Sequence, residues 1–186
     1  MKYALPDWMH IRLFSSMAST HRTLSSLPSG SEVVVKPLAD AIADADSIAL
    51  EHLGKYVDPE VDGFVAWNTA AWTNGVFIHA KRNAIVDKPV YLVYWHNAES
   101  EEVVSVVRNL IVVETNAQLE VFERYGSTGS ASHFSNHVTE ALVQANGGLD
   151  LYTLQNDNGK RYPVRIHTDT PGAFEPRKYV CIYIRR

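Results

Sequence analysis

From about Phe64 onward, apolar and β-branched residues occur in short runs, and hydrophobic and polar positions often alternate within them. In residues 119–123, for example, Leu119 and Val121 would face one side of a strand and Glu120 the other. We predict strands at residues 64–67, 76–79, 90–95, 103–107, 110–113, 119–125, 133–144, 149–155, 162–167 and 179–184. Several connections pass through Asn-Gly or Asn-Ala pairs, which suit tight corners. The pattern is typical of a mainly β chain.

The first part of the chain has a different texture. Residues 1–30 are rich in Ser, Thr and His with few apolar anchors, so we expect them to be loosely attached. A short strand is predicted at residues 32–36. Leu38, Ile42, Ala45 and Leu53 then recur at helical spacing, which predicts an amphipathic helix over residues 38–54 with Pro37 in its first turn and a stop at Gly54.

A weak internal repeat is the strongest architectural signal. Residues 113–122 (VETNAQLEVF) align with residues 143–152 (VQANGGLDLY), an offset of about 30 residues that is typical of stacked repeats. A poorer third copy covers residues 82–86. Stacking these units would place Leu119 over Leu149 and Val121 over Leu151. The repeat favours a β-solenoid, while antiparallel hairpins in a jelly roll or sandwich are the alternative.

Composition narrows the function classes. The chain of 186 residues has 17 Lys+Arg and 21 Asp+Glu, a formal charge of −4, which argues against a general nucleic-acid binder. No apolar stretch approaches the roughly 20 residues that span a bilayer, and the N-terminus lacks the apolar region of a secretory signal. A lone cysteine, Cys181, excludes an internal disulfide framework and a multi-cysteine metal cage. We therefore expect a cytoplasmic protein with no membrane or nucleic-acid partner.

Histidines are the first candidates for chemistry. His133 and His137 are four apart, which on a strand means the same face but about 13 Å of separation, too far to share one metal ion. We interpret both as solvated residues on an outer face. His79, His96 and His167 each lie near the end of a predicted strand and could meet across coils, although nothing in their spacing requires it.

Other candidate residues are weaker still. Cys181 reads as a buried strand residue, and one thiolate cannot hold an iron–sulfur cluster. Carboxylates that could face one another between coils are Glu114, Glu120, Glu123 and Glu140. Aromatic residues that could form a sugar-stacking platform, but more often fill a first coil, are Trp67, Trp72, Tyr91, Tyr94 and Trp95. Phosphate-loop and Gly-x-Ser-x-Gly motifs are missing. We assign no catalytic, cofactor-binding or metal-binding residue, and we expect a chain that is not an enzyme.

Residues 64–79 (FVAWNTAAWTNGVFIH) resemble the entry to the β-domain of the SufB/SufD family, with Trp67 and Trp72 in place of the usual Leu and Phe. Further segments are similar to family strands: KPVYL at 88–92, RNLIVVETNAQL at 108–119 and FSNHVTE at 134–140. Upstream, the turn at residues 27–30 and the strand and helix that follow are similar to the approach to the SufD β-domain. The resemblance covers about residues 24–170 and favours SufD over SufB.

The resemblance implies a right-handed parallel β-helix with a short N-terminal α-helical segment. It also implies a non-enzymatic scaffold of the SUF system for iron–sulfur cluster assembly, which pairs with SufB and binds the ABC-type ATPase SufC. In the family these contacts lie toward the C-terminal part, beyond the matched stretch. We expect no cofactor in this chain itself.

The predicted organisation has three parts: an N-terminal segment (1–61), the early coils of the β-helix (62–170), and a tail (171–186) that departs from the family. We interpret the chain as a truncated or frame-altered product. Its last coil would expose an unpaired edge, so we expect a homodimer or aggregation unless the strand at 179–184 covers that edge. Alternative functions are a carbohydrate-binding or carbohydrate-cleaving β-helix and a metal-dependent jelly-roll enzyme.

Overall fold

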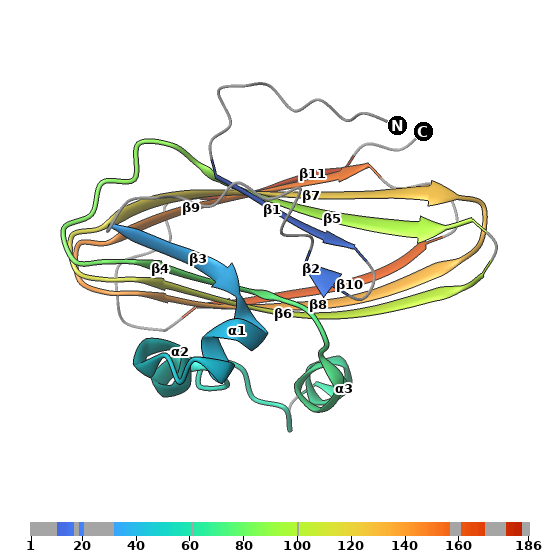
Figure 1. Cartoon of the computed structure of the whole chain (residues 1–186), viewed down its shortest axis with the longest axis horizontal. Helices are drawn as coiled ribbons and strands as arrows, with labels where there is room; N and C mark the ends of the chain where they lie inside the picture. The colour runs from blue at the N-terminus through green and yellow to red at the C-terminus, as the bar shows by residue number, and fades with distance from the viewer. Residues whose placement is uncertain are drawn as a thin grey trace.

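Two facing β-sheets and three short helices make up the described part of the protein (Figure 1). The computed structural model describes residues 11–16, 19–20, 32–60, 62–99, 101–156, 161–169 and 178–183. Sheet A has the strand order β11-β9-β7-β5-β1-β2, and sheet B has the order β10-β8-β6-β4-β3. From β4 to β11, successive strands alternate between the two sheets, with odd-numbered strands in sheet A and even-numbered strands in sheet B.

The elements occur along the chain in the following order. The first five are β1 (Ile11–Ser16), β2 (Ser19–Thr20), β3 (Val33–Pro37), α1 (Leu38–Ala43) and α2 (Ser47–His52). They are followed by α3 (Gly63–Ala71), β4 (Val76–Ala80), β5 (Val90–Ala98), β6 (Val103–Val113) and β7 (Gln118–Gly129). The last four are β8 (His133–Val143), β9 (Gly148–Asn156), β10 (Arg161–Asp169) and β11 (Lys178–Tyr183).

Strands in each sheet pair in parallel, except for β1 with β2 and β3 with β4. Leu119 of β7 lies beside Leu149 of β9, and Val121 lies beside Leu151, so the predicted stacking of the repeat is confirmed. Parallel neighbours that are joined through a strand of the other sheet exclude the antiparallel jelly roll. The arrangement is consistent with the predicted β-helix.

Left-handed asparagines form the corners between the two sheets. Asn83, Asn116 and Asn146 have φ angles of 64°, 63° and 57°, a conformation that asparagine tolerates better than most residues. Their side chains form a ladder in which Asn116 Nδ2 donates to Asn83 Oδ1 at 2.9 Å and Asn146 Nδ2 donates to Asn116 Oδ1 at 3.1 Å. The weak third copy of the repeat is therefore a genuine corner in register with the other two.

The helical region differs from the single helix predicted over residues 38–54. The chain forms α1 and α2, separated by Asp44–Asp46, where Ala45 has a φ of 53°. Asp46 caps α2 by accepting hydrogen bonds from Ile48 N at 3.1 Å and Ala49 N at 3.2 Å. This cap starts a new helix in the middle of the apolar stripe. The predicted stop is correct, because Gly54 follows α2 with a φ of 76°.

The predicted strand at residues 64–67 is wrong, since these residues lie in α3. Asp62 caps this helix by accepting hydrogen bonds from Phe64 N at 2.7 Å and Val65 N at 3.2 Å. Val65 and Asn68 are then buried at helical spacing.

The two runs predicted at 103–107 and 110–113 are one strand, β6, because Arg108 and Asn109 are both buried with polar partners.

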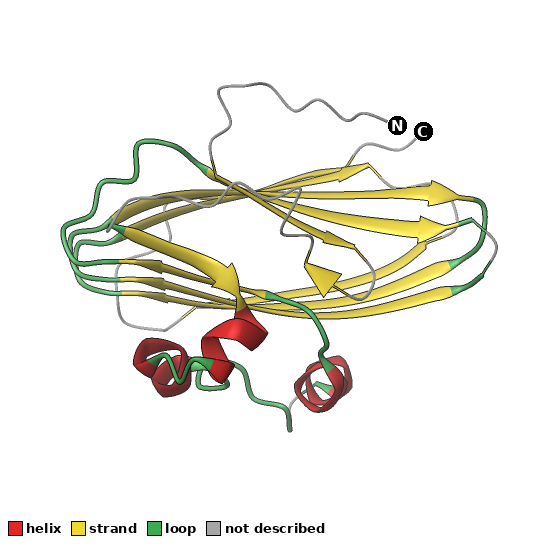
Figure 2. Cartoon of the chain, in the orientation of Figure 1, coloured by secondary structure: helices red, strands yellow, loops and turns green. Residues whose placement is uncertain are grey.

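All three helices cover the outer face of sheet B (Figure 2). Leu38, Ala41 and Ala49 pack with Phe77, Leu110 and Val112 beneath α1 and α2. Val57 and Val65 pack with Val138 beneath α3 and its preceding loop. None of the helices in the described residues is long and apolar enough to cross a membrane.

The tail beyond residue 170 contributes a strand to sheet A. Lys178–Tyr183 (β11) pairs in parallel with β9, so the edge of β9 is covered, as the sequence analysis allowed. Cys181 lies opposite Thr153 in this pairing. Its side chain, whose burial we predicted, lies outside the described part of the structure, as do residues 1–10 and 21–31.

Candidate functional site

Side chains between the two sheets divide into an apolar part and a polar part. The apolar part contains residues such as Ile78, Leu92, Val113, Leu119 and Leu149. Toward the carboxyl ends of the sheet A strands, the inward residues become aromatic and polar. We call this set the interior polar cluster: Tyr94, His96, Asn109, Glu123, Tyr125, His133, His137, Thr139, Thr153, Gln155, Arg165 and His167.

Glu123 is the acidic centre of the interior polar cluster. Its carboxylate accepts hydrogen bonds from the Tyr125 hydroxyl at 3.1 Å and the Thr153 hydroxyl at 3.2 Å, both on Oε2. Asn109 Nδ2 donates to Oε1 at 3.4 Å across the gap between the sheets. His167 Nε2 lies 3.6 Å from Oε2. The carboxylate is thus held by groups from both sheets.

Two tyrosines lie against this carboxylate. Burial first, and then the negative charge of Glu123, raise the pKa of Tyr94 and of Tyr125 well above the usual 10. The Tyr94 hydroxyl donates to Asn109 Oδ1 at 3.0 Å, and the two tyrosine rings stack with centroids 4.9 Å apart. Both phenols therefore stay protonated at neutral pH and act as hydrogen-bond donors. The guanidinium of Arg165 lies 3.9 Å from the Tyr125 ring centroid.

His137 is enclosed by this set. Its side chain is 2% exposed, and the Tyr94 and Tyr125 rings contact it edge-on at centroid distances of 5.0 and 4.9 Å. Neither ring nitrogen has a hydrogen-bond partner among the described residues. Burial first, and then the positive charge of Arg165 and the nearby His96 and His167, lower the pKa of His137 well below 6.5. The imidazole is therefore neutral at physiological pH.

The placement of His133 and His137 corrects our interpretation of the sequence. Both do lie on the same face of β8, but this face points between the sheets, so both are buried rather than solvated. His133 stacks on His96, with ring centroids 4.8 Å apart. Of the three strand-end histidines, His96 and His167 join the cluster, whereas His79 lies elsewhere, 3.0 Å from Glu114. No three His, Cys, Asp or Glu side chains in the described residues are arranged to hold a metal ion.

The four glutamates do not face one another as candidate acid–base pairs. Glu123 points between the sheets, while Glu140 is buried on the outer face of sheet B. Glu140 Oε1 accepts hydrogen bonds from Arg108 Nε at 2.9 Å and Gly54 N at 3.0 Å, and it lies 2.7 Å from Arg108 Nη2. Its Oε2 accepts from Tyr56 N at 3.0 Å. This ion pair fastens the loop after α2 to sheet B.

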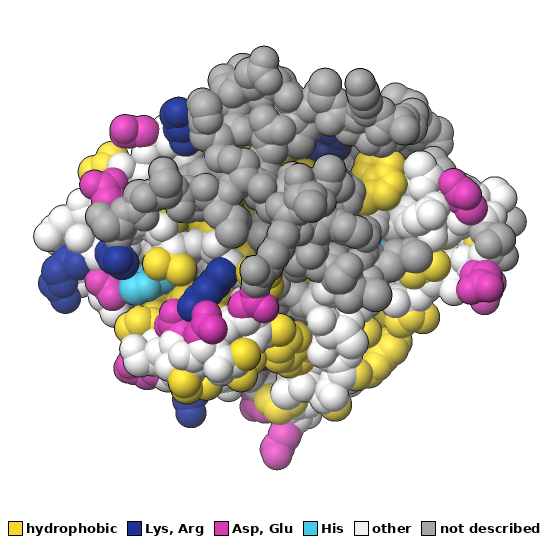
Figure 3. Space-filling model, in the orientation of Figure 1, with side chains coloured by type: hydrophobic (Ala, Val, Ile, Leu, Met, Phe, Trp, Pro, Cys, Tyr) yellow, Lys and Arg dark blue, Asp and Glu magenta, His cyan; other side chains and the backbone are white. Residues whose placement is uncertain are grey.

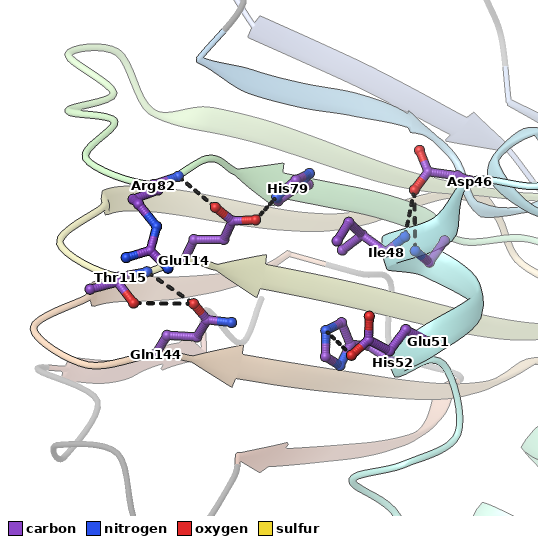
Figure 4. A network of polar contacts seen from close by, with 10 residues as sticks. Asp46, Ile48, Glu51, His52, His79, Arg82, Glu114, Thr115 and Gln144 are labelled. Atoms are coloured by element: carbon purple, nitrogen blue, oxygen red, sulfur yellow. Dashed lines mark hydrogen bonds and ion pairs between the residues drawn. The ribbon is translucent and has the colours of Figure 1, made fainter.

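Glu114 is a corner residue (Figure 4). It lies 3.0 Å from His79 Nε2 and accepts a hydrogen bond from Arg82 N at 2.8 Å. Although burial opposes it, these contacts hold the pKa of Glu114 below its usual value. Gln144, which is equivalent in the repeat, accepts hydrogen bonds from Thr115 N and Oγ1 at 3.2 and 3.3 Å. Each coil is therefore tied to the preceding one at the same point.

The candidate aromatic platform is dispersed over several surfaces. Tyr94 is inside, Trp67 lies on α3, and Trp72 packs beneath α1 and α2. Tyr91 stacks with Phe122 of the next coil, with centroids 5.5 Å apart. Glu120 is half-buried beside Asp150. Trp95 is half-buried and its ring lies against Gly126 of β7. No single surface of the described residues therefore gathers all five rings to stack a sugar.

Several members of the interior polar cluster were missed in the sequence analysis, among them Asn109, Tyr125 and Arg165. Tyr125 follows Leu119, Val121 and Glu123 at two-residue steps, so strict alternation along β7 would have found it. Asn109 interrupts an apolar run, and this pattern predicts a break between two strands where the structure has the single strand β6. Its partners come from other coils, and no local pattern identifies them.

Comparisons with known proteins agree with this architecture. Residues 94–168 match the family described as SUF system FeS cluster assembly, SufBD core domain. Residues 8–92 match the SufBD protein N-terminal region. The chain belongs to the SufB/SufD family. The match to the N-terminal region begins at residue 8, whereas the resemblance seen in the sequence begins at about residue 24.

Curated SufB/SufD relatives are distant and longer. The iron–sulfur cluster assembly protein SufB of Bacillus subtilis is 28% identical over 127 residues, which cover 67% of this chain and 26% of the relative. A SufBD family protein of Synechocystis is 26% identical over 125 residues, or 61% of this chain and 28% of the relative. One from Pyrococcus horikoshii is 25% identical over 138 residues, or 73% of this chain and 29% of the relative. The chain therefore spans less than a third of these relatives.

Proposed function

We propose that this chain acts as a scaffold component of iron–sulfur cluster assembly in the SUF system and works through protein contacts rather than catalysis. The observation that carries the proposal is the pair of consecutive family matches, at residues 8–92 and 94–168, on a stack of parallel strands. The proposed place of action is the cytoplasm.

The architecture suits such a role. We propose that the alternating parallel strands form the early coils of a right-handed β-helix, the winding that predominates when parallel strands are connected. Ladders between coils, such as Asn83–Asn116–Asn146, and buried clamps, such as Arg108–Glu140, fix each coil to its neighbours. A stack fixed in this way presents rigid outer faces to partners.

We further propose a role like that of SufD, with a SufB-like paralogue and the SufC ATPase as partners. The segment approaching the β-domain and the short corners favour SufD in the sequence. The relatives reported above include one named SufB and others named only as SufBD family proteins, so the SufD role rests on the sequence resemblance. A homodimer through a free strand edge stays a prediction.

Co-purification tests the proposal. The chain would carry an affinity tag and be expressed together with untagged SufB and SufC from one bacterium. The family resemblance implies SufB and SufC contacts toward the C-terminal part of longer members, beyond the matched stretch, and we propose that the outer faces of the early coils contribute a further contact. We therefore expect the chain to retain SufB or SufC after washing and to elute with it from a size-exclusion column. A folded chain that retains neither protein would contradict the scaffold role.

Two glycine variants provide a matched control for the fold. A Cβ at Gly75 would lie 1.6 Å from the Arg108 carbonyl oxygen, whereas a Cβ at Gly63 would have nothing within 4 Å. Gly63→Ala should therefore retain the partner as well as the original chain does. Gly75→Ala should lose it, which shows that retention depends on the folded stack rather than on an unfolded sticky chain.

A further inference from the structure

Exposed hydrophobic side chains gather at one end of the outer face of sheet B. We call them the aromatic patch: Phe64 and Trp67 of α3, Val104 of β6, Phe134 of β8 and Tyr162 of β10. Four of them are substantially exposed, with values of 43% for Phe64, 40% for Trp67, 58% for Val104 and 65% for Tyr162. Figure 3 shows hydrophobic side chains beside α3 and acidic side chains at the strand ends. Contiguous exposed apolar surface of this kind marks an interaction site more often than a lone exposed residue does.

Strand register explains how the aromatic patch forms. Val104 lies beside Phe134 in β8, and Phe134 lies beside Tyr162 in β10, so the three make one row across the sheet. The preceding residue of β8, His133, points between the sheets, which places this row on the outside. Trp67 and Phe64 stack on the Phe134 ring with centroids 5.3 and 6.1 Å away. The patch is therefore an ordered surface of five packed side chains.

The helical layer over sheet B ends next to this row. Asn136, two residues beyond Phe134, donates from Nδ2 to the Phe64 carbonyl at 2.8 Å and fixes the start of α3 to the sheet. On the other side of Phe134 lies a shallow pocket lined by Glu102, Val103, Val104, Ser132, His133, Phe134 and Tyr162. The helices α1, α2 and α3 cover the outer face of sheet B elsewhere, and the side chains of Val104 and Tyr162 beside α3 are exposed, so this row is suited to pack against one more helix.

Charge distinguishes between the possible occupants. Glu101 and Glu102 are exposed at the turn before β6, and Asp62 is exposed at the start of α3. Glu102 lines the pocket itself, and no Lys or Arg is among the described residues that line it. A second copy of the chain docking through the same patch would bring these carboxylates toward one another. A basic partner would instead pair with them.

We infer that the aromatic patch is a docking site for an amphipathic helix of another protein, with bulky apolar residues on one face and flanking Lys or Arg. The apolar face would cover Trp67, Val104, Phe134 and Tyr162, and the cations would lie over Glu101, Glu102 and Asp62. This is the helix-in-groove mode of recognition, in which a few apolar anchors supply affinity and rim charges supply specificity. The inference does not depend on the proposed function.

Two synthetic peptides test this site by fluorescence anisotropy. One is a labelled amphipathic peptide of Leu and Lys, and the other has Glu in place of every Lys. We expect the basic peptide to bind the full chain at least about tenfold more tightly than the acidic one, with affinity that falls as salt rises. Equal binding of the two peptides would contradict the charge argument.

Substitutions locate the site on the surface. Val104→Ser with Tyr162→Ser should weaken the basic peptide about tenfold or more, whereas Ile85→Ser with Leu50→Ser, which removes exposed apolar residues elsewhere, should change nothing. Glu101→Lys with Glu102→Lys should weaken it similarly, and Glu51→Lys with Asp87→Lys is the matched control at exposed sites. Every residue replaced in these four double variants is exposed, so we expect all four to fold. Circular dichroism checks that they do.

Two results would overturn the inference. In the first, the patch variants and their controls bind the basic peptide equally, so that binding occurs elsewhere. In the second, sedimentation velocity shows a dimer of the unmodified chain that Val104→Ser with Tyr162→Ser converts to monomer. The patch would then be covered by a second copy, not by a basic helix.

Discussion

The buried ion pair between Arg108 and Glu140 gives the sharpest test of how the helical layer is held. Arg108 is 2% exposed and Glu140 is fully buried. Glu140→Gln removes the negative charge and leaves the guanidinium unpaired. Both carboxylate oxygens of Glu140 accept hydrogen bonds, Oε2 from Tyr56 N and Oε1 from Gly54 N and Arg108 Nε. The NH₂ group of glutamine would take the place of one of these acceptors and would face a donor. Breaking one side of a buried pair typically costs about 3–5 kcal/mol.

That loss is a large part of the roughly 5–15 kcal/mol by which domains are stable. At roughly 2–4 °C per kcal/mol for a chain of this size, we expect Tm to fall by about 6–20 °C. Thermal and urea unfolding followed by circular dichroism measure the change. Glu51→Gln, on the exposed face of α2, is the control and should stay within about 0.5 kcal/mol of the original chain.

Replacing both partners separates the two contributions. Arg108→Met with Glu140→Leu removes the unpaired charge, so it should recover much of the loss, although Gly54 N and Tyr56 N still lose their acceptor. If Glu140→Gln unfolds at the same urea concentration as Glu51→Gln, the ion pair does not fasten the helical layer and the reasoning fails.

Three further changes test other parts of the structure. Asn116→Ala should lower the free energy of unfolding by about 1–3 kcal/mol, measured by urea unfolding, because it loses both ladder hydrogen bonds and places alanine in a left-handed conformation. Asn116→Gly should recover the part of this loss that comes from strain. Equal losses for the two variants would argue against strain. Gly75→Ala should destabilise the chain by more than about 3 kcal/mol in the same assay while Gly63→Ala stays near neutral, and the reverse order would contradict the close approach to Arg108. Because the pKa of His137 is lowered in the folded chain, the unfolded chain binds more protons than the folded one below pH 6.5. The free energy of unfolding should therefore fall as the pH decreases through 6.5, by up to about 1.4 kcal/mol per pH unit. His137→Phe should flatten this slope in urea unfolding between pH 5 and 7, and an unchanged slope would exclude His137 as its source.

The sequence predicts the stacking well because the repeat contains its own register. Aligning Leu119 with Leu149 also aligns the asparagine corners, and the structure confirms both. Parallel pairing follows from the same alignment, since equivalent residues of successive coils can lie side by side only when their strands run the same way. The family resemblance came from these segments too.

The errors have local physical causes. Residues 64–67 are apolar enough for a strand, but the Asp62 cap and the burial of Val65 and Asn68 favour a helix. His133 and His137 are polar, so alternation alone suggested an outer face, whereas in this stack polar side chains fill one half of the interior. The partners of His137 come from β5 and β7, more than ten residues away in sequence, and only the fold brings them together.

The central claim is that successive coils lie side by side in parallel register. Nuclear Overhauser contacts between backbone protons in isotopically labelled protein measure this directly. We predict contacts from residues 118–122 of β7 to residues 148–152 of β9, and from β6 to β8, in ascending order along both strands. Contacts from β7 to residues 133–143 in descending order would instead show an antiparallel hairpin and contradict the account.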